Sequence, residues 1–151
     1  MAGHKIPVSV LVVIHTPDLQ VLLLERADHP GYWQSVTGSC EPGETLLQTA
    51  VREVAEETGL DATKFKLSDW HSENVFEIYA EWRKRYAPGV THNTEHMFGL
   101  ELPAPLPVTL APREHLNHVW LPWQEAAKKV FSWTNAAALE HLPERSAGKY
   151  L

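Results

Sequence analysis

The run REVAEETGL, at positions 52–60, places three glutamates and one arginine within nine residues. If the run is helical, successive residues turn by about 100°, so Glu53, Glu56 and Glu57 share one face. Glu53 and Glu57 are four residues apart, and like charges at that spacing destabilise a helix by only about 0.2–0.5 kcal/mol. The run by itself therefore fits either a solvated helix surface or a site that attracts a cation.

Carboxylates grouped on one helix face have a specific chemical use. Mg²⁺ prefers oxygen ligands, keeps several of its waters and can bridge carboxylates to phosphates. A bound cation of this kind polarises a phosphoryl oxygen and lowers the pKa of an attacking water. If the run is such a site, Glu53 and Glu57 are the expected metal ligands, with Glu56 as a third ligand or as the general base. The expected cofactor is then Mg²⁺, with Mn²⁺ as a possible substitute.

The residues upstream of the run make the pattern much more specific. Gly38, five residues, Glu44 and seven residues precede REVAEETGL, and Val54 and Leu60 are bulky aliphatic residues within it. This is the Nudix box, whose seven fixed letters match by chance on the order of once in a hundred million starting positions at ordinary residue usage. The chain resembles the Nudix hydrolases. The resemblance implies one Nudix domain over residues 1–151, with an α/β/α sandwich, a mixed β-sheet and hydrolysis of phosphoanhydride bonds.

Two further residues of the box have expected roles. Arg52 points to a different side of the helix from the glutamate face, so we expect it to orient a box glutamate through an ion pair. By resemblance, Glu44 reaches a metal through water or braces Arg52. Both are predicted members of the catalytic group, together with Glu56 and Glu57.

Other stretches extend the resemblance from about Lys5 to about Leu142. The segments KIPVSVLVVI, WQSVTGS, RYAPGVTHNTEH, EHLNHVWL and SWTN are similar, in this order, to the bacterial dihydroneopterin triphosphate pyrophosphohydrolases of folate biosynthesis. The resemblance implies hydrolysis of dihydroneopterin triphosphate to the monophosphate and pyrophosphate, with some activity on nucleoside triphosphates. It also implies that Glu114 is a metal ligand outside the box. The implied substrate contacts are Lys5, Arg26, Thr37, Phe76, Glu77, Ile78, Tyr79 and Ser132.

Two alternatives remain open from the sequence. One is a Nudix hydrolase of nucleoside triphosphates or dinucleoside polyphosphates. The other is a catalytically silent Nudix-fold module that binds a nucleotide or a protein, although such modules usually lose box carboxylates and this box is complete. The basic cluster Arg83, Lys84 and Arg85 is either a solvated turn or a contact for a triphosphate or an acidic partner.

Composition limits the partners and the compartment. The 151 residues carry a formal net charge of -6, which argues against sequence-independent binding to nucleic acid. The apolar run PVSVLVVI is too short to span a membrane, and the sequence indicates no obligatory protein partner. Cys40 is the one cysteine, so no intrachain disulfide is possible and a cytoplasmic location is expected. The expected partner is a small-molecule triphosphate.

Periodicity and turn residues predict the elements that position these side chains. A capping-box pattern at Thr45 and Gln48 starts the box helix, Gly59 ends it, and its core-facing stripe is Leu47, Ala50, Val51, Val54 and Thr58. A strand over residues 8–16 has a hairpin partner over residues 21–26, and a further strand breaks at Gly38. The remaining expected elements are strands at 73–82, 94–102 and 115–122 and helices at 122–131 and 134–142.

Overall fold

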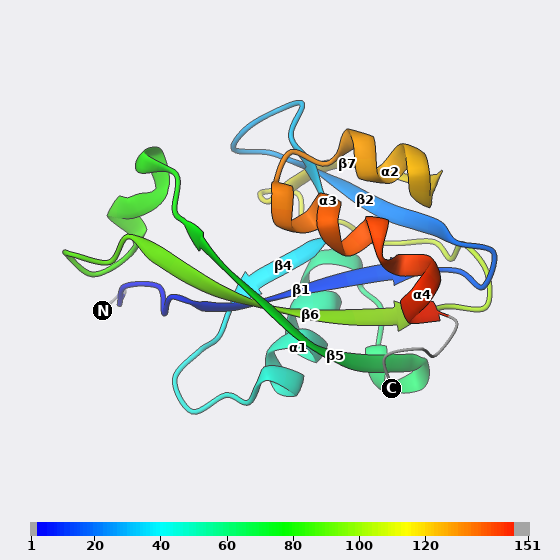
Figure 1. Ribbon diagram of the computed structural model, residues 1–151, viewed down its shortest axis with the longest axis horizontal. Helices are drawn as coiled ribbons and strands as arrows, with labels where there is room; N and C mark the ends of the chain where they lie inside the picture. Colours follow the sequence, from blue (N-terminus) through cyan, green and yellow to red (C-terminus); the bar gives the residue numbers. More distant parts are fainter. Residues whose placement is uncertain (1–2, 147–151) are drawn as a thin grey trace.

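Strand β1 (Val8–His15) is the central strand of a mixed sheet in the computed structural model, which describes residues 3–146. It runs parallel to β6 (His92–Glu101) and antiparallel to β4 (Val36–Ser39). On one side β6 pairs with β5 (Lys66–Glu77), and on the other β2 (Gln20–Arg26) pairs with β3 (Trp33–Gln34) and β7 (His115–Pro122). Within the described residues the sheet has seven strands. Figure 1 shows β1 between β4 and β6.

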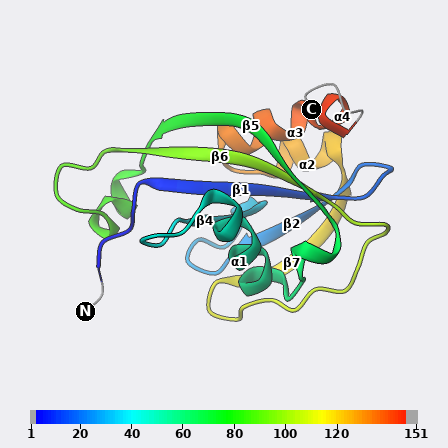
Figure 2. The ribbon, with the colours of Figure 1, turned by 90° about the horizontal axis from the view of Figure 1, so that it is seen from below.

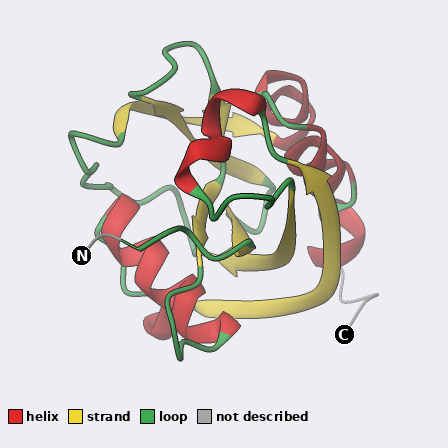
Figure 3. Ribbon diagram, turned by 90° about the vertical axis from the view of Figure 1, so that its left-hand side faces the viewer, coloured by secondary structure: helices red, strands yellow, loops and turns green. Residues whose placement is uncertain are grey.

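The sheet is covered by helices on both faces. Helix α1 (Leu46–Thr58) packs Ala50 and Val54 against Val10, Val12 and Ile14 of β1. Three helices cover the opposite face, where Leu11 and Val13 of β1 point: α2 (Trp123–Lys129), α3 (Trp133–Glu140) and α4 (Leu142–Ser146). Because alternate residues of a strand point to opposite faces, a strand buried on both sides reads as a continuous apolar run. The predicted α/β/α sandwich with a mixed sheet is confirmed (Figures 2 and 3).

Helix α1 begins and ends where local sequence signals predict. The Thr45 hydroxyl accepts from the Gln48 amide, the Gln48 side chain accepts from the Thr45 amide, and Gly59 adopts a left-handed conformation with φ of 75°. The predicted apolar stripe is wrong at Leu47, whose side chain is 55% exposed. The helix buries Glu53 and Glu57 instead, so its buried surface includes acidic side chains that an apolar-stripe rule leaves out.

The predicted hairpin of the first two strands is correct only at its turn. His15 of β1 pairs with Val21 of β2, and this is the one pair that joins the two strands. Farther from the turn, β4 takes the edge of β1 from Val12 to Ser9, and β2 pairs with β7. The two strands therefore separate, because each finds its longer partner far away in the sequence.

Other predicted boundaries also differ from the structure, and β5 begins at Lys66 rather than at Glu73. The strand containing Gly38 does not break there, because β4 continues to Ser39 and Gly38 pairs with Val10; the interruption falls at Ser35. Residues 80–82 were expected to be extended, but they begin a 3-10 helix, η2 (Ala80–Arg85), beyond the end of β5. A second short 3-10 helix, η1 (Ala62–Lys64), follows α1. Within residues 3–146, no helix is long and apolar enough to cross a membrane.

Gly99 of β6 lies under the ring of Trp70 of β5. A β-carbon built at Gly99 would lie 2.5 Å from Trp70 Cζ2 and 2.6 Å from Cε2. The ring is nearly buried, and the Arg145 guanidinium lies 5.2 Å from its centre on the side of α4. Because Gly99 has no side chain, Trp70 can pack against β6 at this end of the apolar layer between the sheet and helices α2 to α4.

We expect Gly99→Ala to destabilise the protein by about 1–3 kcal/mol, because the added methyl group forces Trp70 out of its packed position. Urea unfolding followed by tryptophan fluorescence measures the change. Ser68→Ala is the matched control, since Ser68 pairs with Gly99 on β5 and its change adds no atom. Equal unfolding free energies for the two variants would show that the ring tolerates the methyl group.

Candidate active site

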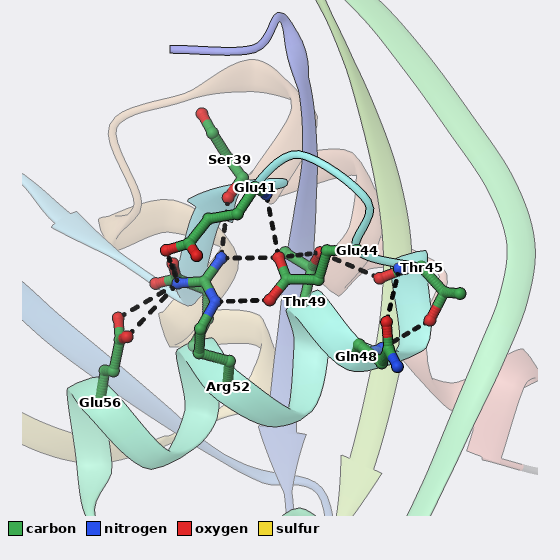
Figure 4. A network of polar contacts seen from close by, with 9 residues as sticks. Ser39, Glu41, Glu44, Thr45, Gln48, Thr49, Arg52 and Glu56 are labelled. Carbon is green, nitrogen blue, oxygen red and sulfur yellow. Dashed lines mark hydrogen bonds and ion pairs between the residues drawn. The ribbon is translucent and has the colours of Figure 1, made fainter. Parts of the chain in front are cut away.

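The Arg52 side chain connects the loop before α1 to the acidic face of the helix. Its Nε and Nη2 donate to the two carboxylate oxygens of Glu44 at 2.7 and 2.9 Å, and Nη2 also donates to the Ser39 carbonyl at 3.0 Å. Its Nη1 donates to Glu53 Oε1 at 2.6 Å. Figure 4 shows the bonds of Arg52 to Glu44 and Ser39. The hydrogen bond from Arg52 is the main reason why the pKa of Glu44 falls to about 2. The ion pair that the sequence predicts for Arg52 is present, and Glu44 braces it.

Glu53 and Glu57 form the centre of the site. They are 9% and 2% exposed, and their carboxyl groups hydrogen-bond to each other. Burial raises the pKa of both groups, and the pKa of Glu57 rises further because it donates to Glu53 and lies near the charges of Glu53 and Glu114. Glu57 Oε1 has no hydrogen-bond partner. Two acidic groups are therefore kept together at a cost that a bound cation would offset.

The elements around this pair leave it little space. A β-carbon at Gly38 would lie 2.1 Å from Cδ of Glu53, so β4 can pass the carboxylate only where it has no side chain. The backbone of Thr37 hydrogen-bonds to Glu57 from the same strand. His115 Nε2 of β7 lies 3.6 Å from Glu57 Oε1. Burial lowers the pKa of His115 to about 4, so the ring is neutral near pH 7 and this contact is not an ion pair there.

The donor set fits a hard divalent cation. Carboxylate oxygens are the preferred ligands, and Mg²⁺ is commonly held by one or two carboxylates, with waters and substrate phosphates completing its shell. Among residues 3–146, no three Asp, Glu, His or Cys side chains converge into a ready metal cage. Glu53 and Glu57 would thus hold the ion with help from outside the helix. Glu114 lies in the turn before β7, borders the same cavity and is exposed.

Glu56 does not join the buried pair. Its carboxylate is half-exposed and lies 3.3–3.4 Å from Arg52 Nη1, on the outer side of the guanidinium. The sequence placed it on one face with Glu53 and Glu57, but burial divides that face. Glu56 is therefore in position to exchange protons with solvent, while the other two are enclosed.

A cavity of about 970 Å³ opens beside the glutamate pair. The N-terminal segment, β4, the β5–η2 corner, β6 and the start of α3 all contribute to its wall. It brings together all the substrate contacts implied by the resemblance, whereas Glu44 and Glu56 do not border it. These contacts are Lys5, Arg26, Thr37, Phe76, Glu77, Ile78, Tyr79 and Ser132.

Basic side chains line one part of the cavity wall. Arg26 makes a bidentate pair with Asp28 at 2.7 Å and lies over the Trp82 ring, and Arg85 reaches the same Asp28 at 3.1 Å. Desolvation inside the cavity, followed by the charges of Arg85 and Arg26, lowers the pKa of Lys5. Within the basic cluster of Arg83, Lys84 and Arg85, only Arg85 borders the cavity. Arg83 pairs with Glu77 instead.

Other predicted contacts have structural partners of their own. The Thr37 hydroxyl donates to the Val10 carbonyl at 2.9 Å, and the Ser132 hydroxyl accepts from the Asn135 amide and caps α3. Tyr79 stacks on Trp82 at 5.2 Å between ring centres, and both rings approach Phe131. Phe76 and Ile78 border the cavity from the end of β5. Apolar and aromatic side chains therefore border the cavity beside the basic ones.

Sequence reasoning missed several cavity residues. Glu95 and Asn93 on β6 are buried polar side chains in the cavity wall, and His115 contacts Glu57. Trp82 and Phe131 also border the cavity. One signal was available: in THNTEHMFGL, the alternation of β6 places Glu95 on the same face as Met97, where an apolar residue is expected. A carboxylate at a core position of a strand indicates a functional group.

Metal binding by Glu57 can be tested through stability. Because its folded pKa is raised, metal-free protein loses stability as pH rises from about 4.5 through the folded pKa. We expect metal-free Glu57→Gln to melt several degrees above the unsubstituted protein at pH 8, with the gap closing toward pH 5. Added Mg²⁺ should raise the Tm of the unsubstituted protein and leave that of the variant unchanged. Differential scanning fluorimetry measures both effects, with Glu73→Gln on β5 as the exposed control. Equal Mg²⁺ responses would remove Glu57 from the metal site.

Arg52→Lys tests the brace. Lysine keeps the charge but cannot bridge Glu44, Glu53 and Ser39 together, so we expect a loss of about 1.5–3 kcal/mol in unfolding free energy. Arg83→Lys, at the more exposed pair with Glu77, should lose no more than about 1 kcal/mol. Urea unfolding compares the two variants. A loss at Arg52 no larger than that at Arg83 would mean that the network adds little to stability.

Known proteins match this chain over most of its length. The NUDIX domain model matches residues 5–142. The dihydroneopterin triphosphate diphosphatase of Escherichia coli K12 is 48% identical over 140 residues, covering 91% of this chain and 92% of the relative. The enzyme of the same name from Haemophilus influenzae is 41% identical over 143 residues, covering 93% and 89%.

A solved structure agrees with these relatives. The E. coli dihydroneopterin triphosphate pyrophosphohydrolase superposes with a TM-score of 0.86 at 47% identity, over 92% of this chain and 96% of that one. Nudix hydrolases generally need a divalent metal, which agrees with the donor set around Glu53 and Glu57. With the box complete and the family model covering residues 5–142, this chain belongs to the NUDIX domain family and is a Nudix hydrolase.

Proposed function

We propose that this protein is a Mg²⁺-dependent pyrophosphohydrolase that converts dihydroneopterin triphosphate into dihydroneopterin monophosphate and pyrophosphate. The observation that carries the proposal is the braced, buried pair Glu53 and Glu57, which opens into a cavity bordered by Lys5, Arg26 and Arg85. The similarity to dihydroneopterin triphosphate diphosphatases supports the choice of substrate. We place the enzyme in the cytoplasm, since its single cysteine leaves no pair for an intrachain disulfide.

We assign the metal to Glu53 and Glu57, with Glu114 as a further ligand from the β7 side. When bound, a divalent cation neutralises phosphate charge and lowers the pKa of a coordinated water. Arg52 and Glu44 hold Glu53 in place, which keeps the ligand geometry fixed before substrate arrives. We assign Glu56 as the candidate general base, because its carboxylate is half-exposed and it lies next to Glu57 on α1. Mn²⁺ is a possible substitute for Mg²⁺.

The cavity wall suits a triphosphate joined to a flat ring. Lys5 offers a cationic donor for phosphate oxygens, and Arg26 and Arg85 add to it when they give up part of their pairs with Asp28. Phe76, Tyr79 and Phe131 offer apolar surfaces for a ring. In the reaction, water attacks a phosphorus, its proton passes to a base of the site, and pyrophosphate leaves.

A substrate panel with separate detection of pyrophosphate and orthophosphate tests this function. With Mg²⁺, we expect the highest kcat/KM for dihydroneopterin triphosphate and release of pyrophosphate, and EDTA should abolish turnover. Glu57→Gln should lower kcat by at least about 100-fold while the protein stays folded, and Glu73→Gln should leave kcat unchanged.

Two outcomes would contradict the proposal. A higher kcat/KM for a nucleoside triphosphate or a dinucleoside polyphosphate would replace the pterin substrate while keeping the chemistry. No pyrophosphate from any member of the panel would indicate a binding module without catalysis.

A further inference from the structure

Glu95 is an acidic side chain buried in the wall of the cavity. It lies on β6, is 5% exposed, and belongs to the sheet face covered by the C-terminal helices, opposite to α1. Its Oε1 has no hydrogen-bond partner. Burial raises the pKa of Glu95 to about 7, while the neighbouring side chains of Thr134 and Thr37 oppose that rise. The metal chemistry assigned to α1 makes no use of this carboxylate.

Asn93 presents a second unpaired acceptor on the same wall. It lies two residues before Glu95, so both side chains project from the same face of β6. The Asn93 side chain is also buried, and its Nδ2 donates to Ser9 Oγ at 2.7 Å. That bond directs the amide, and Oδ1 has no partner. Leaving a buried acceptor unpaired is unfavourable, so two together on one cavity wall indicate a ligand that brings N–H donors.

The position of Glu95 relative to the metal site suits a molecule that spans both. Thr37 lies between them: its backbone hydrogen-bonds to Glu57, and its hydroxyl, which donates to the Val10 carbonyl, lies close to Glu95. The phosphates of a substrate at Glu53 and Glu57 would therefore lie on one side of β4. The ring of the same substrate would lie on the other side, below the start of α3, where Thr134 also contacts Glu95.

We propose that Glu95 determines ring specificity: its carboxylate accepts two parallel N–H bonds from a ring N–H and its neighbouring exocyclic amino group, the edge that pterins and guanine share. The assignment rests on the proposed function for the pterin, and it extends to any triphosphate with this edge. A carboxylate receives two parallel N–H donors with good geometry. Adenine presents one amino group beside a bare ring nitrogen, so an ionised Glu95 would meet a second acceptor there.

Removing one partner at a time isolates the contact. Inosine triphosphate is GTP without the exocyclic amino group, and Glu95→Gln replaces one carboxylate oxygen with an amide that donates. We expect the unsubstituted enzyme to prefer GTP over ITP by about 10- to 100-fold in kcat/KM. In Glu95→Gln this ratio should fall to about 1–3, because the second acceptor is lost. The kcat/KM for dihydroneopterin triphosphate should fall with that for GTP, and the value for ATP should stay or rise.

A binding measurement separates this inference from the proposed function. Calorimetric titration of guanosine, inosine and adenosine monophosphates, without metal, reports ring recognition alone. The guanosine preference should be present in the unsubstituted protein, lost in Glu95→Gln and retained in the control Glu73→Gln. If dihydroneopterin triphosphate is not hydrolysed but this preference is found, the proposed function fails and the role of Glu95 remains.

Other outcomes would overturn the role. Equal kcat/KM values for GTP and ITP in the unsubstituted enzyme would mean that Glu95 makes no contact with the exocyclic amino group and is bound by water instead. A uniform fall of all substrates in Glu95→Gln would make Glu95 a structural residue. Glu95→Gln should melt at or above the unsubstituted protein at pH 8, since it removes a carboxylate whose burial is unfavourable. If it melts lower, Glu95→Asp decides: a retained guanine preference supports the contact, and its absence overturns it.

Discussion

Glu53 and Glu57 lie next to each other on one helix, with their carboxyl groups in contact and little access to water. Placing two acidic groups in this way is unfavourable by itself, and several neighbouring features reduce the cost. Arg52 donates to Glu53, the Thr37 backbone hydrogen-bonds to Glu57, and Gly38 leaves room for the carboxylate. These features come from the helix, the loop before it and β4, so the acidic pair constrains how the three meet.

The same constraint explains why the loop before α1 has a defined conformation. Glu44 sits between the Arg52 guanidinium and the Thr49 hydroxyl, and it also accepts from the Glu41 amide. Two sets of hydrogen bonds therefore join the loop to the helix, one at the Thr45 cap and one at Glu44. The charge of Glu44 is retained down to low pH by its partner, so the brace keeps its charges over the range in which Glu53 and Glu57 change protonation.

Much of this site could be predicted from the sequence, because its signals are local. The capping box, Gly59 and the spacing of the box glutamates all act within one helix and its loop, and each lies where it was expected. Long-range pairing could not be predicted in the same way. The separation of β1 from β2 depends on β4 and β7, which are distant in sequence and compete for the same edges. The division between buried Glu57 and half-exposed Glu56 likewise depends on what covers α1.

Thr37 approaches Glu57 and Glu95, the two acidic regions of the cavity, with different atoms. Its backbone contacts Glu57, whereas its hydroxyl contacts Glu95. A backbone contact persists whichever residue occupies the position, while a side-chain contact changes with every substitution. A substitution at position 37 can therefore change the surroundings of Glu95 without moving β4, whose backbone contacts Glu57. This gives a physical route by which one hydrolytic centre can be kept while the family diversifies the molecules that it accepts.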